Sequence, residues 1–285
     1  MIGRLIAVGL ASAALLFPAF AQAAVENRPI EEKRLASGKE SLSPTKGYIY
    51  LHAPARVTAM LIKEPSAEEL AAYEAEWSAA LAEAKIKYPR TLKNWRDDVE
   101  WARKHRKSIP ERPLEPTEET FRIDRLDQRM IVNNGPQFIY ASQGEEFGYL
   151  HELEPGTYRY YGPIIAAANG TAGGVCACMG SVKFEVKPGV ITNLGDLLVT
   201  SVTRVVEPSA GIDLDHVVQR IDYTFPERLS AFPNQQADWR AAGKIDNFYG
   251  LMVGRMPPIP DVLAYDRDAI IDLKAAPSGA SAGGS

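Results

Sequence analysis

The chain has 285 residues, a formal net charge of −4 and two cysteines. Hydrophobic residues make up 46% of it, which is enough for a substantial core in one or two domains. A mildly acidic chain offers no broad electrostatic footprint for nucleic acid. Two cysteines exclude a small fold that several disulfides hold together.

The first 23 residues have the layout of a secretory signal peptide. Arg4 gives a basic start, residues 5–20 form an uncharged apolar run, and residues 21–23 (AQA) match an A-x-A cleavage pattern. We therefore expect a mature protein that begins at Ala24 and is periplasmic or secreted. The alternative is a membrane anchor, since an uncharged run of this length can span a bilayer, but Pro18 and the many small residues disfavour it. No second run of this kind follows, so we expect no membrane span after cleavage.

The mature chain opens with a polar segment and two strands. Residues 24–46 are polar and aperiodic, which predicts a flexible lead-in. Residues 48–51 (YIYL) and 57–62 (VTAMLI) are rich in aromatic and β-branched residues, which predicts two strands with a break at residues 52–54 (HAP).

A helical block follows. Ser66 and Glu69 have the spacing of a capping box. Beyond them, apolar residues recur at three- and four-residue steps, which indicates amphipathic helix; the two stripes are Leu70, Tyr73, Trp77, Leu81, Ala84 and Tyr88, then Leu92, Trp95, Val99 and Ala102. Pro89 separates them and ends or kinks a helix, so we expect a helical hairpin or one kinked helix. Residues 108–120 predict a stiff, Pro-rich spacer.

From residue 121 the helical period disappears, and short strand-like runs alternate with turns. Pro-Gly pairs such as residues 188–189 suit type II turns. Strands are predicted at residues 121–132, 137–141, 147–153, 157–161, 182–186, 190–194, 197–206, 213–224 and 246–253.

These elements predict a mainly β fold. We expect an antiparallel β-sandwich formed by residues 47–63 and 121–274, with residues 64–120 as an inserted helical arm that includes the Pro-rich spacer. One or two short helices are expected within residues 226–243, and residues 275–285 are small and polar, which predicts a disordered tail.

Several turn motifs carry a family resemblance. They are GYIYL at residues 47–51, LEPGTY at 153–158, SVKFEVKPG at 181–189 and NLGD at 193–196. These runs are similar to those of small exported bacterial β-sandwich families of unknown function, in which a Pro-Gly-x-Tyr hairpin precedes a strand that ends in a second glycine turn. The resemblance implies a transthyretin-like or immunoglobulin-like sandwich and transfers no functional residue.

Cys176 and Cys178 form the one constellation with obvious reactivity. In an extended strand both side chains point to one face with Cα atoms about 6.6 Å apart, near the upper limit for a disulfide, so the bond requires a bend. In an oxidising compartment neither has another intramolecular partner, which favours a local disulfide. Two alternatives stay open: thiols that are reduced, buried or bonded to another chain, and a soft-metal site completed by a Met or His from elsewhere.

The remaining polar candidates form weaker patterns. None of His52, His105, His151 and His216 has the spacing of a helical metal site. His52 and His151 flank strand ends and could meet in space, although a histidine with ordinary hydrogen-bond partners is the commoner arrangement. Asp213 and Asp215 would share one strand face, where they could bind a cation, act as acid and base, or simply face solvent.

No catalytic motif is found, so we assign no catalytic, cofactor-binding or metal-binding residue. We expect a non-enzymatic binding or assembly module of the envelope or periplasm. Trp77, Trp95 and Trp101 make the helical arm the best surface for a protein partner, unless they pack on the sandwich. A soft-metal-handling protein that uses Cys176 and Cys178 is the first alternative. A secreted hydrolase is the second, and a pocket that combines acidic residues with a histidine would favour it.

Overall fold

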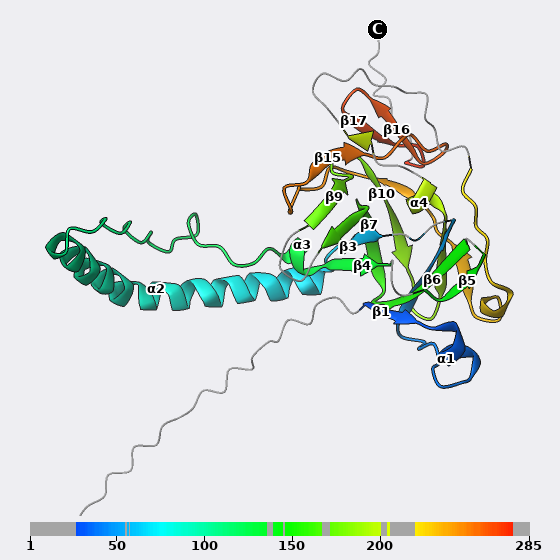
Figure 1. Ribbon diagram of the computed structural model, residues 1–285, viewed down its shortest axis with the longest axis horizontal. Coiled ribbons are helices and arrows are strands. Elements are labelled where there is room, and N and C mark those ends of the chain that lie inside the picture. The colour runs from blue at the N-terminus through cyan, green and yellow to red at the C-terminus, as the bar shows by residue number, and fades with distance from the viewer. Residues whose placement is uncertain are drawn as a thin grey trace, which may run out of the picture.

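The computed structural model describes residues 27–54, 56, 58–135, 139–144, 146–166, 172–200, 204–205 and 220–275. The described chain is mainly β-strand, with several mostly antiparallel sheets and one long helix. Figure 1 shows this helix projecting from a body made of strands. This confirms the prediction of a mainly β fold with a helical arm.

The first large sheet has the strand order β1 (Asn27–Ile30), β6 (Glu146–Leu153), β2 (Gly47–Ala53), β11 (Ile191–Gly195) and β13 (Asn234–Gln236), and β5 (Ala141–Gln143) also pairs with β6. The expectation of purely antiparallel pairing is wrong here, because β11 pairs in parallel with both β2 and β13. The other pairs in this sheet are antiparallel.

The second large sheet is antiparallel throughout, in the order β14 (Arg240–Ala242), β10 (Ser181–Val186), β7 (Gly156–Gly162), β3 (Ala59–Lys63) and β4 (Ile131–Asn134). A smaller sheet joins β12 (Arg204–Val205), β15 (Met252–Arg255), β9 (Ala172–Cys176) and β8 (Ile164–Ala166), and β16 (Leu263–Asp266) pairs with β17 (Ala269–Asp272).

One hydrophobic cluster takes side chains from both large sheets. Ile49 and Leu51 come from the first sheet, and Leu61, Tyr160 and Phe184 come from the second. Apolar burial of this kind supplies most of the driving force for folding. Four tyrosines are fully buried in this core; they are Tyr149, Tyr158, Tyr160 and Tyr161.

A second cluster covers the opposite face of the first sheet, which we call the outer face. Tyr48, Tyr50 and Leu150 belong to it, and residues 27–46 and 225–232 contribute the apolar side chains that pack on it. The structure therefore differs from a flexible lead-in: β1 pairs with β6, and α1 (Glu32–Ala36) follows directly. Ile30, Leu35 and Leu42 contribute to this cluster, and three apolar residues spread over a polar segment give little periodic signal.

The arm is a single helix, α2 (Ala67–Lys104), of 38 residues. The capping box is confirmed, since Ser66 Oγ accepts from the Glu69 amide at 3.2 Å and Glu69 Oε2 accepts from the Ser66 amide at 2.7 Å. The hairpin expectation is wrong, because Pro89 lies inside the helix. A proline removes only one backbone hydrogen bond from a helix and bends it, and Figure 1 shows α2 curving along its length.

The Pro-rich spacer runs back along α2 and covers its apolar stripe. Trp95 Nε1 donates to the Pro110 carbonyl at 3.0 Å, and the Tyr88 hydroxyl lies 3.4 Å from the Pro113 carbonyl. Nearer the body, the Trp77 ring lies 6.5 Å from that of Phe121. We call residues 107–125 the return segment. The helix and the return segment together form an arm in which Trp77, Tyr88 and Trp95 are half-buried.

The arm leaves and re-enters the body between two neighbouring strands. Ile62 of β3 is paired with Ile131 of β4. Buried Lys63 places its Nζ 2.6 Å from Glu69 Oε1 and 3.3 Å from Glu154 Oε2, which joins strand, helix and β-turn. Farther out, Arg129 pairs with Glu76 at 2.8 Å and lies over the ring of Tyr73.

Short segments elsewhere differ from expectation. Residues 197–206 were expected as a strand, but α4 (Leu197–Thr200) is helical. Residues 121–132 contain α3 (Leu126–Arg129) before β4 begins. Within 226–243 the expected short helix is present as the 3₁₀ helix η1 (Glu227–Leu229), whereas the strands β13 and β14 that follow it were not expected. Strands this short are determined by the sheet edge they join, because strand propensity depends strongly on context.

The arm should be separable from the body. Replacing residues 65–118 by a short Gly/Ser linker should leave a folded β protein with a cooperative thermal transition and a much smaller helical circular dichroism signal, because β3 and β4 are already adjacent. Loss of cooperative melting would show that the arm is required for the core to form.

Candidate functional site

The structure joins Cys176 and Cys178 in the expected disulfide, and both side chains are buried. The Cα atoms lie 5.1 Å apart, closer than in an extended strand, because the chain turns after Cys176. The Ala177 amide donates to the Tyr161 carbonyl at 2.7 Å and the Met179 amide donates to the Gly254 carbonyl at 3.0 Å, which fixes this turn between β7 and β15.

In the described residues, no group of three or more His, Cys, Asp or Glu side chains is placed to hold a metal ion. The two sulfur atoms are bonded to each other, so a soft metal would first require reduction of the disulfide. The carboxylates Asp213 and Asp215, and His216, lie outside the described residues.

His52 and His151 do not meet. His52 is paired with Gly148, whereas His151 is paired with Ile49, and alternate residues of a strand point to opposite faces. His52 lies on the outer face and His151 on the other face of the same sheet. His151 is buried and its Nδ1 lies 2.8 Å from Asn27 Oδ1. Burial lowers the pKa of His151 to about 4.

His52 lines a pocket of about 470 Å³ on the outer face, which we call the outer-face pocket. Its polar lining includes Glu32, Tyr50, His52, Glu146, Glu227 and Arg228. These residues come from α1, β2, β6 and η1, which lie far apart in the sequence. Since no local motif links them, the sequence provides no signal for this pocket.

Contacts within the outer-face pocket define its chemistry. His52 Nε2 lies 3.7 Å from Glu146 Oε2, and neither ring nitrogen has a hydrogen-bond partner among the described residues. Arg228, which also lines the pocket, pairs with Glu32 at 3.1 Å. A Cβ at Gly148 would lie 2.5 Å from the Tyr50 hydroxyl, so this glycine makes room for the tyrosine ring. Burial raises the pKa of Tyr50, which therefore stays a neutral donor. An imidazole beside a carboxylate can accept and release protons.

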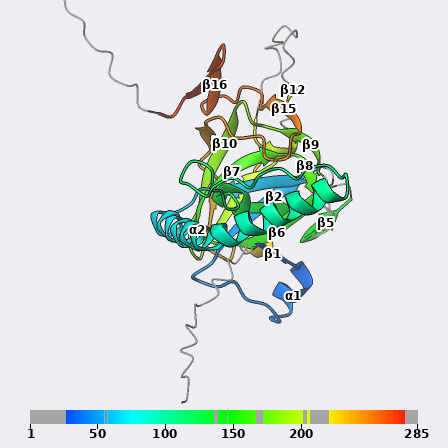
Figure 2. The same ribbon diagram turned by 90° about the vertical axis from the view of Figure 1, so that its left-hand side faces the viewer.

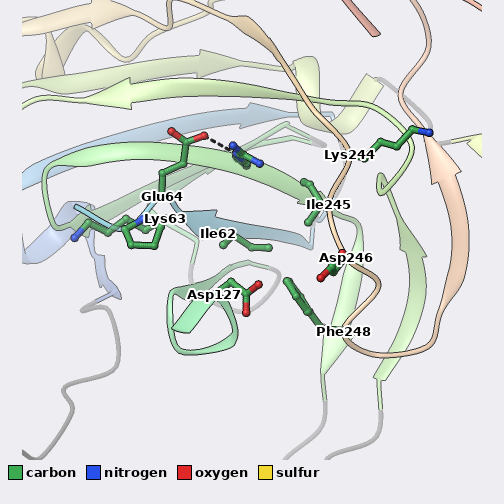
Figure 3. Close-up of a pocket in the computed structure, with 10 residues that line it drawn as sticks. Ile62, Lys63, Glu64, Asp127, Lys244, Ile245, Asp246 and Phe248 are labelled. Atoms are coloured by element: carbon green, nitrogen blue, oxygen red, sulfur yellow. Dashed lines mark hydrogen bonds and ion pairs between the residues drawn. The ribbon is translucent and has the colours of Figure 1, made fainter. Parts of the chain in front are cut away.

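A second pocket, of about 320 Å³, lies at the root of the arm (Figure 3). The polar groups around it are paired with one another. Glu64 Oε1 accepts from Arg159 at 2.5 Å, and Arg125 pairs with Asp127 at 2.8 Å and Asp246 at 2.5 Å. Figure 3 shows Lys244 extending away from the other labelled side chains. Paired charges of this kind fit a structural role, because they leave few polar groups to recognise a ligand.

The arm carries much of the exposed apolar surface. Nine large apolar side chains of the described residues are exposed, and five of them lie on the arm: Leu70, Ile86, Trp101, Ile109 and Leu114. The three arm tryptophans are not part of the β core. Trp77 and Trp95 are half-buried within the arm, and Trp101 is 55% exposed. The arm surface therefore differs from the expectation, because the return segment covers two of the three tryptophans.

Comparisons with known proteins give no identification: no family model, no curated protein and no solved structure matches the chain. Among the described helices, none combines the length and apolar character needed to cross a membrane.

His151 should make stability depend on pH. Its pKa is about 4 when folded and near 6.5 when unfolded, so the unfolded chain takes up the proton first as pH falls. The free energy of unfolding should decrease by about 3 kcal/mol between pH 6.5 and pH 4 on this account. When the free energy of unfolding is measured with urea at each pH, its dependence on pH should be smaller for His151→Gln than for the wild type. The same pH dependence in His151→Gln and the wild type would contradict this role of His151. An equal reduction of the pH dependence by His105→Gln, at the exposed end of α2, would also contradict it.

The disulfide should contribute little to stability. A ring closed over one intervening residue removes little entropy from the unfolded chain, so reduction should lower the free energy of unfolding by about 2 kcal/mol or less. Urea unfolding with and without a reductant measures the effect, and a Cys176→Ser, Cys178→Ser variant should not respond to the reductant. Two free thiols in the purified protein, with stoichiometric copper or zinc, would contradict the disulfide.

Proposed function

We propose that this chain is an exported, non-enzymatic assembly module of the periplasm or cell exterior that docks a partner protein on its helical arm. The observation that carries the proposal is the exposed apolar surface of the arm. Ile86 on α2 is 80% exposed and Leu114 on the return segment is 78% exposed. Exposed apolar side chains gathered on one projecting element are typical of interaction surfaces.

The construction of the arm supports this function. A helix of 38 residues is about 57 Å long. Helices in proteins take most of their stability from tertiary packing. Here the return segment provides that packing through Trp95, Tyr88 and Trp77. The arm can therefore hold its shape before a partner binds, which lowers the entropic cost of association.

Export is part of the proposal. The signal-peptide layout of residues 1–23 supports it, and so does a disulfide between the chain's two cysteines, since disulfides persist mainly in oxidising compartments. A mature N-terminus at Ala24, found by sequencing protein from the native host, is the expected result.

For the body we propose a sandwich of the transthyretin-like or immunoglobulin-like type, formed by the two large sheets. The core cluster to which both sheets contribute supports it. The parallel pairing of β11 with β2 and β13 departs from a purely antiparallel sandwich.

Site-specific photocrosslinking tests the docking function. A photoreactive amino acid at position 86 or 114 should give a defined crosslinked protein in the native host, and Ile86→Asp with Leu114→Asp should abolish association with that protein. Position 271 is the matched control, because Ile271 is an exposed apolar residue of β17 on the body. Crosslinks of equal yield from all three positions would contradict an arm-specific partner.

A second candidate function is hydrolysis, and the outer-face pocket favours it because His52 lies there with Glu146 and two further glutamates. Chromogenic ester, phosphate and glycoside substrates are suitable probes. Turnover that His52→Ala removes, and that His105→Ala leaves intact, would move this candidate to first place.

The soft-metal alternative, with Cys176 and Cys178 as thiolates, is tested by metal analysis of the reduced protein.

A further inference from the structure

The far end of the arm differs in charge from the rest of the chain. We call residues 101–109 (WARKHRKSI) the arm tip; here α2 ends and the chain reverses into the return segment. The tip contains four Lys and Arg residues and no Asp or Glu, although Asp97, Asp98 and Glu100 precede it on α2 and Glu111 follows it. Figure 1 shows this end of the arm standing away from the β body, and Figure 2, in which that side faces the viewer, shows α2 in front of the strands.

The four cations of the tip are exposed and unpaired. They are Arg103, Lys104, Arg106 and Lys107, and within the described part of the chain none of them takes part in an ion pair or a side-chain hydrogen bond. Within the described residues, Lys85 and Arg90 of α2 also take part in no ion pair, so what distinguishes the tip is that its cations are clustered. Unpaired like charges that lie close together repel one another, so a bound anion would relieve this repulsion.

The backbone at the tip places an arginine where glycine is preferred. The Lys107 amide donates to the Ala102 carbonyl at 2.9 Å and the Arg106 amide donates to the Arg103 carbonyl at 3.4 Å, the two bonds of a Schellman helix end. The residue at its left-handed position is Arg106, with φ at 54°. Glycine adopts this conformation without a steric penalty, so the helix end by itself gives no reason for a cation here.

Two exposed apolar side chains flank the cations. Trp101 is 55% exposed and its ring stacks on His105 with centroids 4.4 Å apart, and Ile109 is 56% exposed. Tryptophan is enriched where membranes meet water, because one edge of its ring is polar and the rest is apolar. Basic residues in the last turn also complement the helix dipole, which accounts for Arg103 and Lys104 but not for Arg106, Lys107, Trp101 or Ile109.

We propose that the arm tip binds the surface of an anionic phospholipid bilayer, with the cations at the phosphate groups and Trp101 and Ile109 at the interface. Charge complementarity selects this partner, since clustered Lys and Arg beside aromatic and aliphatic residues suit anionic lipid. The arm also holds the tip away from the body by a helix of about 57 Å.

The inference goes beyond protein docking and can be tested without a partner. Mature protein should sediment with vesicles of phosphatidylcholine and 30% phosphatidylglycerol but not with phosphatidylcholine alone, and high salt should release it. Replacing Arg103 and Arg106 by Gln should weaken partitioning by at least about tenfold. Trp101→Ala should also weaken it. The matched control is Lys85→Gln with Arg90→Gln, which removes the same charge from exposed positions nearer the middle of α2.

Arg106→Gly separates a binding role from a structural one. Glycine suits the left-handed position, so this variant should melt at the same or a higher temperature and yet bind anionic vesicles more weakly. Absence of binding to anionic vesicles would overturn the proposal, as would equal weakening by the control pair. Unchanged vesicle binding in the tip variants, with loss of a crosslinked acidic protein instead, would also overturn it. Failure of the partner crosslinks at positions 86 and 114 would leave the vesicle result standing, so the two proposals fail separately.

Discussion

The buried ammonium group of Lys63 makes the interaction that joins the arm of this molecule to its body. A buried cation is stable only when it is paired, and here Glu69 from the first turn of α2 and Glu154 from the β6–β7 turn supply the partners. Burial alone would raise the pKa of Glu69, but the hydrogen bonds from Lys63 and Ser66 outweigh burial and hold that pKa below its ordinary value. The pairing fixes the direction in which α2 leaves the sheet.

The position of the arm in the topology explains how it can be long without disturbing the body. Its two ends are adjacent strands of one antiparallel sheet, so β3 and β4 behave as a hairpin whose connection has been greatly extended. Long insertions between adjacent strands add little loop-closure cost. The body retains its own core, and Trp77, Tyr88 and Trp95 of the arm pack against the return segment.

Features that depend on residues close together in the sequence could be predicted from it. The capping box at Ser66 and the apolar stripe of α2 depend on residues three or four apart, and both could be predicted from the sequence. The disulfide could be predicted because Cys176 has no other intramolecular partner. The effect of Pro89 could not be predicted, because a proline either ends a helix or bends it. Packing by the return segment, which joins the two halves into one bent helix, is not visible in the local sequence.

Features formed by distant segments could not be predicted. The outer-face pocket brings His52 of β2 beside Glu146 of β6 and Arg228 of η1, and Gly148 matters there only because Tyr50 lies over it. Strands β13 and β14 are three residues each and exist as additions to sheet edges. The coverage of Trp77 and Trp95 also requires the path of the return segment, which a Pro-rich composition leaves open.

The central claim is that the arm stands free of the body as a preformed rod. Small-angle X-ray scattering of the mature protein, compared with the variant that lacks residues 65–118 but has the same termini, tests it most directly. A compact chain of this length would have a radius of gyration of about 18 Å. The account predicts a clearly larger value for the full arm and a return toward the compact value without it. Nearly equal values for the two proteins, both close to about 18 Å, would show that the arm folds onto the body and would contradict the claim.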